Sequence, residues 1–320
     1  MLVFGPVPSR RLGRSVGINN IPPKNCTYSC VYCQVGRTTG MSVTRRSFHR
    51  PAEILEAVEE KLRQTEAVGA AVDYLTVVPD GEPTLDINLG MLLDGLQRFG
   101  IPTAAISNSS LVWNRDVREA LSKADWVSLK VDSTRESTWR AVDRPHGELS
   151  LDRILEGILE FSECFSGELV TETMLVAGLN SSPDELEVTG EFLARADPDT
   201  AYISVPTRPP AEDWVMAPSA AEINTAYHIL SGYLKQVRYM IHYEGEDFTR
   251  TGDPVSDLLS ILSVHPMREK AVLKFLSEEE DPEAILSMLT DKGLMERVRY
   301  ENEIYCLRRF PERPSASGNL

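Results

Sequence analysis

The stretch CTYSCVYC, residues 26–33, places Cys26, Cys30 and Cys33 within eight positions of one another. Thiolates that lie this close on one loop can converge on a single soft-metal site, and iron–sulfur clusters are held by cysteine thiolates. The other two cysteines, Cys164 and Cys306, lie far along the chain and far from each other. The spacing therefore predicts one iron–sulfur site with three cysteine ligands from a single loop.

Two other kinds of site also use clustered cysteines. A structural zinc ion normally takes four ligands, and His49 as the fourth would lie at a spacing that is not typical of zinc sites. A disulfide framework needs paired cysteines and an oxidising compartment. The chain has five cysteines, an odd number, and residues 1–8 lack the layout of a secretory signal. We therefore favour an iron–sulfur cluster in a protein of the reducing cytoplasm.

A second motif follows a predicted strand. The run from Asp73 to Pro79 is short, apolar and rich in β-branched residues, and it ends at DGEPT, residues 80–84. This pattern is typical of a buried strand that ends in a turn. Gly81 lets the backbone approach a ligand closely, and Glu82 offers acceptors to an ammonium group. By itself the turn is equally compatible with Glu82 in solvent; after a cysteine triplet, a ligand role is favoured.

The cysteine spacing and this turn together resemble the radical SAM superfamily. The resemblance implies one 4Fe–4S cluster with three cysteine ligands, whose fourth iron binds the amino and carboxylate groups of S-adenosylmethionine (SAM). It also implies that an electron from the cluster breaks a C–S bond of SAM to give the 5′-deoxyadenosyl radical. In the superfamily, the position of Tyr32 lies near the adenine, and the motif of Gly81, Glu82 and Pro83 binds the methionine amine.

Four further stretches carry a narrower resemblance, at residues 4–15, 81–85, 144–146 and 206–210. They are similar to small Fe–S oxidoreductases that are named as similar to wyosine synthases, which rebuild a guanosine in transfer RNA. Wyosine synthases carry a second cluster on further N-terminal cysteines, whereas no cysteine precedes Cys26 here. The resemblance therefore implies a single cluster and argues against a true wyosine synthase.

Charge is distributed unevenly along the 320 residues, of which 42% are hydrophobic and 25% charged. No apolar run approaches the roughly 18 residues of a membrane span. The net charge is −15, yet residues 1–52 hold eight basic residues and no acidic one, so residues 53–320 carry −23. The N-terminal cations could balance the cluster and the SAM carboxylate, or they could bind an anionic substrate. Arg10, Arg11 and Arg14 are the candidates for substrate binding.

Strand and helix patterns alternate along the first two thirds of the chain. They predict strands at residues 15–21, 73–79, 103–107, 126–131, 169–176 and 201–205, and helices at residues 51–66, 88–99, 115–123, 151–164 and 183–195. This alternation predicts an α/β fold with a parallel sheet and helices outside it. A closed barrel needs eight such units, so six strands suit a partial (β/α)6 parallel barrel of radical SAM type over residues 1–245.

Ligands of parallel βα folds gather at the carboxyl ends of the strands, which selects further candidates. Ser107 and Asn108 follow the third strand. The fourth carries Ser128, Lys130 and Asp132 at period two, hence on one face. A Lys and an Asp facing a barrel interior are costly unless paired or bound to a ligand. We expect either a mutual ion pair or contact with the ribose or carboxylate of SAM.

Two more candidates follow the last two predicted strands. Gly178 lies in a turn that suits the adenine side of a SAM site. Arg208 lies in the run PTRPP after the sixth strand, where it could clamp an anion or pair with Glu212.

The tail of the chain has a different pattern, after a linker-like region at residues 245–253. Helices are predicted at residues 254–264, 269–276 and 282–291, and an alternating hairpin at residues 294–300 and 303–309. This order predicts a winged-helix-like domain at residues 253–311, followed by a disordered tail at residues 312–320. Because residues 253–311 carry a net charge of −4 and duplex binding favours a basic face, we expect a packing, peptide-binding or docking role.

Three hypotheses of function follow. The chain is a radical SAM enzyme acting on RNA or a nucleotide, a radical SAM enzyme that modifies a peptide or protein, or a non-enzymatic Fe–S regulator whose winged helix reads DNA. The first is motivated by the N-terminal arginines and the second by the tail. The acidic tail and the Gly-Glu-Pro turn argue against the third. Either enzyme would need an external electron donor of the flavodoxin or ferredoxin type.

Overall fold

The computed structural model describes residues 2–241 and 248–309, and within them the main feature is an eight-stranded sheet. The sheet has the strand order β1-β2-β5-β6-β7-β8-β9-β10. Strands β2 and β5 to β10 run parallel, and β1 pairs antiparallel with β2 at the edge. The strands are β1 (Val3–Ser9), β2 (Gly13–Ile18), β5 (Tyr74–Val77), β6 (Thr103–Ser107), β7 (Trp126–Lys130), β8 (Glu168–Met174), β9 (Thr200–Ser204) and β10 (Val237–Met240).

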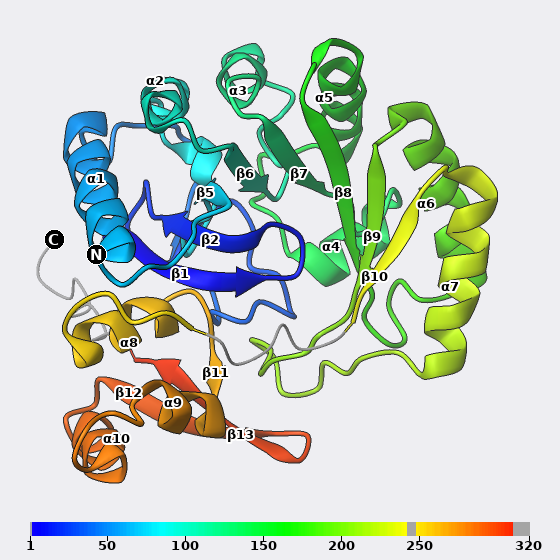
Figure 1. Cartoon of the computed structure of the whole chain (residues 1–320). Helices are drawn as coiled ribbons and strands as arrows, with labels where there is room; N and C mark the ends of the chain where they lie inside the picture. Colours follow the sequence, from blue (N-terminus) through cyan, green and yellow to red (C-terminus); the bar gives the residue numbers. More distant parts are fainter. Residues whose placement is uncertain (1, 242–247, 310–320) are drawn as a thin grey trace, which may run out of the picture.

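Helices cover the outside of this sheet in an open arc (Figure 1). They are α1 (Pro51–Ala67), α2 (Leu89–Leu96), α3 (Arg115–Leu121), α5 (Leu151–Cys164), α6 (Pro183–Ala196) and α7 (Ala220–Tyr233). Helix α4 (Glu136–Asp143) lies inside the arc, where its last residues bond to residues 29–31, and short 3-10 turns form η1 (Pro83–Leu85) and η2 (Gln97–Phe99) (Figure 1). Helix α1 illustrates the local cause: proline occupies its first position, and Ile54 and Val58, four residues apart, are fully buried. The architecture is the predicted α/β fold with a mostly parallel sheet.

The elements that were not predicted have weak sequence signals. Strand β1 contains Pro6 and Pro8, which argue against a strand, but it lies at an edge where proline is tolerated. Strand β10 has only four residues, two of them exposed. Helix α7 buries only Ala226 and Leu230, so its apolar face is narrow.

The C-terminal residues form a second, smaller unit of three helices and a three-stranded antiparallel sheet. Its elements are α8 (Pro254–Leu262), β11 (Met267–Arg268), α9 (Glu269–Phe275), α10 (Pro282–Asp291), β12 (Met295–Tyr300) and β13 (Glu303–Arg308), with the sheet order β11-β13-β12. This agrees with the predicted helices and hairpin, while the winged-helix interpretation stays a prediction. Part of the predicted linker (residues 242–247) and the predicted disordered tail (residues 312–320) lie outside the described residues.

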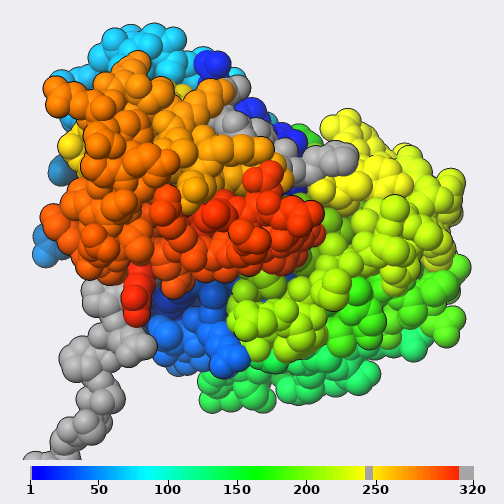
Figure 2. Space-filling model, turned by 90° about the horizontal axis from the view of Figure 1, so that it is seen from below, coloured from blue at the N-terminus to red at the C-terminus, as the bar shows by residue number. Residues whose placement is uncertain are grey.

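This C-terminal unit packs directly on the N-terminal edge of the barrel. Phe4 and Val7 of β1 belong to the same buried apolar cluster as Leu258 of α8. Lys61 of α1 forms an ion pair of 3.1 Å with Asp257 of α8, and both side chains are about nine-tenths buried. Figure 2 shows the unit, in orange and red, against the barrel. Within the described residues, no helix is both long enough and apolar enough to cross a membrane.

Candidate functional site

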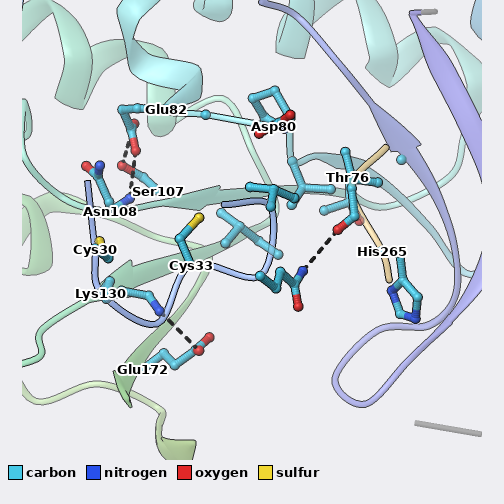
Figure 3. Close-up of a pocket in the computed structure, with 18 of the residues that line it drawn as sticks. Cys30, Cys33, Thr76, Asp80, Glu82, Ser107, Asn108, Lys130, Glu172 and His265 are labelled. Carbon is cyan, nitrogen blue, oxygen red and sulfur yellow. Dashed lines mark hydrogen bonds and ion pairs between the residues drawn. The ribbon is translucent and has the colours of Figure 1, made fainter. Parts of the chain in front are cut away.

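A cavity of about 340 Å³ lies at the carboxyl ends of the central strands. It is lined by the turn after β5, by Ser107 and Asn108 at the end of β6, by Lys130 at the end of β7 and by Glu172 on β8. Figure 3 shows Glu82, Ser107 and Asn108 on one side of it, Lys130 and Glu172 on another, and Cys33 between them. The position is the one expected for a ligand site in a parallel βα fold.

The three predicted cluster ligands all line this cavity. They lie on the loop between β2 and α1. Within this loop, β3 (Asn25–Cys26) pairs with β4 (Gly40–Met41), so the two ends of the segment that carries the cysteines are joined. The backbone N–H of Cys33 donates to the carbonyl of Cys30 at 3.1 Å, which forms a tight turn between two of the thiols. Cys164 ends α5 and Cys306 lies in β13, both away from the cavity. One loop thus brings three thiols to one cavity.

The thiols fit an iron–sulfur cluster in number and chemistry. Within the described residues, no three His, Cys, Asp or Glu side chains converge on a single point as a mononuclear metal site requires. Burial raises the pKa of Cys26 to about 12, burial and Asp143 raise the pKa of Cys30 well above its usual value, and burial raises that of Cys33. The free thiols are therefore protonated at neutral pH, so loading a metal cluster must release protons.

The turn after β5 is fixed by close backbone contacts. Gly81 has φ +148°, and a Cβ at this position would lie 1.9 Å from the carbonyl oxygen of Asn25, so only glycine fits. The backbone N–H of Glu82 donates to the same carbonyl at 3.0 Å. The turn is therefore attached to the residue that precedes Cys26, and the two predicted motifs form one structure.

The carboxylate of Glu82 is already well supplied with donors. Its Oε1 accepts hydrogen bonds from the backbone N–H and hydroxyl of Thr84 and from the hydroxyl of Ser107 at 2.5–3.1 Å. Its Oε2 accepts from the backbone N–H of Asn108 at 2.7 Å. Glu82 is 1% exposed, and only Oε2 has capacity for a further donor. The contact of Glu82 with the methionine amine stays a prediction. The structure adds a second role, since these hydrogen bonds hold the turn against the end of β6.

Asp80, which was not a candidate from the sequence, lies in the same turn and lines the cavity. It is 3% exposed, and among the described residues neither carboxylate oxygen has a hydrogen-bond partner. Lys24 is its ion-pair partner, at 3.8 Å. Burial raises the pKa of Asp80 to about 6. The signal in the sequence was an acidic residue directly before the Gly-Glu-Pro turn.

Lys130 does not pair with Asp132, which was one of the two expectations. Its Nζ lies 3.4 Å from Oε1 of Glu172 and 4.7 Å from the ring centroid of Tyr32. Glu172 also forms an ion pair with Arg11 from the β1–β2 turn. Burial opposes ionisation of Glu172, but Lys130 and Arg11 hold its pKa well below the ordinary value. The site therefore has a triad of two partly buried cations and one buried carboxylate.

Asp132 does not line the cavity, although its hydrogen-bond partner Tyr32 does. It accepts hydrogen bonds from the hydroxyl of Tyr32 and, at 2.7 Å, from the backbone N–H of Met174. Three other predicted SAM contacts also lie outside the residues that line the cavity: Pro83 begins η1, Ser128 is buried in β7, and Gly178 is an exposed turn residue with φ +73°.

The predicted substrate arginines separate into two groups. Arg10 and Arg11 line the cavity, and Nη1 of Arg10 donates to the carbonyl of Met240 at 2.6 Å. Arg14 is exposed at the start of β2, outside the cavity. Arg208 lines the cavity and is 5% exposed. It bonds to other partners than Glu212, which instead pairs with Arg37 and Arg144.

Comparison with known proteins agrees with this geometry. The family model of the Radical SAM superfamily matches residues 20–193. The UPF0026 protein MJ1312 of Methanocaldococcus jannaschii is 39% identical over 320 residues, covering 99% of each chain. The UPF0026 protein slr1464 of a Synechocystis strain is 35% identical over 209 residues, which cover 65% of this chain and 76% of that one.

A solved structure shows the same fold. A radical SAM methyltransferase from Sphaerobacter thermophilus has a TM-score of 0.53 and 13% sequence identity, over 71% of this chain and 66% of that one. The family model and the full-length relative identify the family. The chain belongs to the radical SAM superfamily and, within it, to the UPF0026 proteins.

Proposed function

We propose that this enzyme holds one 4Fe–4S cluster on Cys26, Cys30 and Cys33, cleaves SAM reductively, and uses the resulting radical on an anionic substrate of the nucleotide or RNA class. The observation that carries the proposal is that the three thiols, the Glu82 turn and the cationic triad line a single cavity. The family uses a 4Fe–4S cluster and SAM. When bound, the cluster supplies the electron that breaks SAM into methionine and the 5′-deoxyadenosyl radical.

The residues of the chain supply orientation and charge. The side-chain amide of Asn108 donates to the sulfur of Cys26 at 3.5 Å and to the hydroxyl of Thr27 at 2.8 Å, so it orients the first ligand of the loop. Oε2 of Glu82 offers the acceptor that an ammonium group needs. The buried side chains around them exclude water, which protects a reactive radical from side reactions.

The anionic class of the substrate is supported by the triad of Arg11, Glu172 and Lys130. Two cations share the carboxylate of Glu172, so this part of the cavity wall has more cationic than acidic side chains. A carboxylate or phosphate group of a ligand would offer these cations a second partner. Arg10, which also lines the cavity, adds to the positive potential on this side.

An external one-electron donor of the flavodoxin or ferredoxin type completes the proposed reaction, and we place the enzyme in the cytoplasm. The peptide-modifying alternative lacks an observation that favours it over an anionic substrate. A non-enzymatic Fe–S regulator is disfavoured because members of the superfamily are enzymes.

The direct test is anaerobic reconstitution followed by reduction in the presence of SAM. We expect one 4Fe–4S cluster per chain and slow release of 5′-deoxyadenosine and methionine, measured by liquid chromatography and mass spectrometry. Addition of a panel of nucleoside monophosphates and of RNA should accelerate release for one member. A loaded, reduced protein that leaves SAM intact would contradict the proposed reaction. Acceleration by a neutral peptide alone would contradict the anionic class.

A further inference from the structure

Three segments that are far apart in the sequence meet at one end of the cavity. They are the cluster loop at Gln34, the segment after β9 at Arg208, and the connection between α8 and β11 at Val264 and His265. Nε2 of Gln34 donates to the carbonyl of Val264 at 3.0 Å. Nη1 of Arg208 donates to Oε1 of Gln34 at 2.6 Å, and Nη2 of Arg208 lies 3.1 Å from Nε2 of His265.

The chemistry of these groups fixes their arrangement. A guanidinium has only donors, so both Oε1 of Gln34 and Nε2 of His265 must be acceptors toward Arg208. The amide of Gln34 is therefore held in one orientation, with its nitrogen toward the C-terminal unit. Arg208 and His265 are 5% and 8% exposed, so water competes little with these bonds.

The same residues are part of the cavity wall. Gln34, Arg208, Val264 and His265 all line the cavity that contains the three thiols. Figure 3 shows His265 at the end of the cavity that lies opposite Glu82. Gln34 directly follows Cys33, so a movement of the C-terminal unit that shifts the backbone at Gln34 also shifts the attachment point of that thiol. A single hydrogen-bonded residue, Gln34, thus connects the C-terminal unit to the loop of the cluster ligands.

The hairpin of the C-terminal unit also faces the barrel. Tyr305 of β13 donates to the carbonyl of Thr207 at 2.9 Å, and Tyr300 of β12 donates to that of Pro206 at 3.2 Å. Figure 2 shows this hairpin, in red, against the yellow-green segment that follows β9. These two tyrosines attach the hairpin to the segment that carries Arg208.

We propose that the C-terminal unit is a structural part of the active site: Val264 and His265 close the end of the cavity opposite Glu82, and Gln34 couples the position of this unit to the cluster loop. Gln34 and His265 are positioning residues that act on the cluster through the loop and through Arg208. This role extends the proposed function but does not depend on which substrate the enzyme uses.

The test compares a cluster-loop variant, a variant on the C-terminal unit and a matched control. Gln34→Leu keeps the size of the side chain and removes both of its hydrogen bonds. His265→Ala removes the contact with Arg208 from the other side, far in sequence from every cysteine. Tyr305→Phe removes two hydrogen bonds of the same unit, one donated to the carbonyl of Thr207 and one accepted from Nε of Arg268, and neither involves the cluster loop. Circular dichroism of each variant checks that it is folded.

Hydrogen–deuterium exchange of the apoprotein gives the first readout, independent of any cofactor. One lost hydrogen bond should raise local opening by about fivefold to tenfold. We expect faster exchange in residues 26–38 and 263–266 for Gln34→Leu and His265→Ala. For Tyr305→Phe we expect faster exchange in residues 205–208, 267–268 and 303–308, and unchanged exchange in residues 26–38. The second readout is the electron paramagnetic resonance spectrum of the reduced, fully loaded protein without SAM, which should change in the first two variants and not in the control.

The outcomes separate a coupled unit from an independent one. An altered spectrum in His265→Ala supports the proposal, because the described contacts connect His265 to the cluster loop through Arg208 and Gln34 and through the adjacent Val264. An effect of Gln34→Leu with none of His265→Ala, in either readout, overturns it. Equal effects of Tyr305→Phe and Gln34→Leu on the spectrum overturn it too. If the reconstituted protein fails to cleave SAM, the proposed function fails while the exchange result still decides the coupling.

Discussion

The side-chain amide of Asn108 donates a hydrogen bond to the sulfur of Cys26 at 3.5 Å, between residues 82 positions apart in the chain. The backbone N–H of Asn108 also donates to Glu82, so one residue at the end of β6 contacts both the cysteine motif and the Gly-Glu-Pro turn. The cluster loop is therefore anchored to the sheet at its first ligand. This connection explains why two short motifs that are separated in sequence form a single site.

Replacement of any one of Cys26, Cys30 or Cys33 by Ala should abolish cluster binding. The three thiols come from one loop, and neither remaining cysteine lies at the cavity to replace a lost ligand. Iron and sulfide content after anaerobic reconstitution measures this. Cys164→Ala and Cys306→Ala are the controls and should keep four irons per chain. Eight irons per wild-type chain, or iron loss in a control, would contradict a single three-cysteine cluster.

Glu82→Gln should retain the cluster and weaken SAM binding. The substitution keeps the size of the side chain but removes the negative charge and makes the atom facing Asn108 a possible donor, so an ammonium group loses its acceptor. Equilibrium dialysis of loaded protein with SAM measures the affinity. Thr84→Val is the matched control, because it removes a donor to the same carboxylate outside the cavity. Equal affinity in Glu82→Gln and wild type would show that Glu82 only holds the turn.

Arg10→Ala combined with Arg11→Ala should weaken binding of a phosphate-bearing substrate, whereas Arg14→Ala should not. The first two arginines line the cavity, and Arg14 is exposed outside it. We expect normal iron content and near-normal SAM cleavage in the absence of substrate. The salt dependence of RNA or nucleotide binding should decrease by up to about two charges. A double variant that cannot hold its cluster or SAM would assign these arginines to the cofactors instead.

Asp80→Asn should stabilise the apoprotein at neutral pH. The unfolded chain ionises Asp80 near its ordinary pKa of 3.8, whereas burial raises the pKa of the folded state to about 6. Between these values the folded state binds more protons, so Asp80 makes the protein less stable as pH rises and is fully destabilising above pH 6. The variant should recover up to about 3 kcal/mol at pH 7.

Urea unfolding of wild type and Asp80→Asn at pH 4 to 7 measures this difference. The gap between the two proteins should open between pH 4 and 6 and then stay constant. Asp257→Asn provides a contrasting control, because the carboxylate of Asp257 accepts several hydrogen bonds and pairs with Lys61. A constant gap across the pH range would mean that Asp80 is not buried as a costly charge.

The central fold could be predicted because its signals are local. The strands at β5, β6, β7 and β9 are short apolar runs, and α5 was predicted at the residues that the structure gives, Leu151–Cys164. The cluster loop was equally predictable, since three ligands within eight residues need no tertiary information. The same local reasoning failed at β1, where two prolines obscured a strand that the edge of the sheet tolerates.

The remainder of the site depends on contacts that a sequence does not display. Glu172 was missed because its partners, Lys130 and Arg11, lie 42 and 161 positions away. An ion pair of Lys130 with Asp132 was one of two expectations, because both residues occur at period two in the same predicted strand, and the other was contact with SAM. In the structure the hydroxyl of Tyr32 donates a hydrogen bond to Asp132, and Lys130 pairs with Glu172 of the neighbouring strand β8. Which charged side chains pair between neighbouring strands depends on the register and twist of the sheet, and a single amino-acid sequence does not specify these.

The packing of β1 on the C-terminal unit has a consequence for how the protein is made. Phe4 and Val7 are synthesised about 250 residues before Leu258, their partner on α8. Until α8 emerges, this face of the edge strand is an apolar surface without its partner, while the parallel strands can already pair. Strand β1 can therefore reach its final packing only after α8 has left the ribosome. Contacts between segments this far apart in the sequence close slowly, so the barrel edge is expected to be completed late in folding.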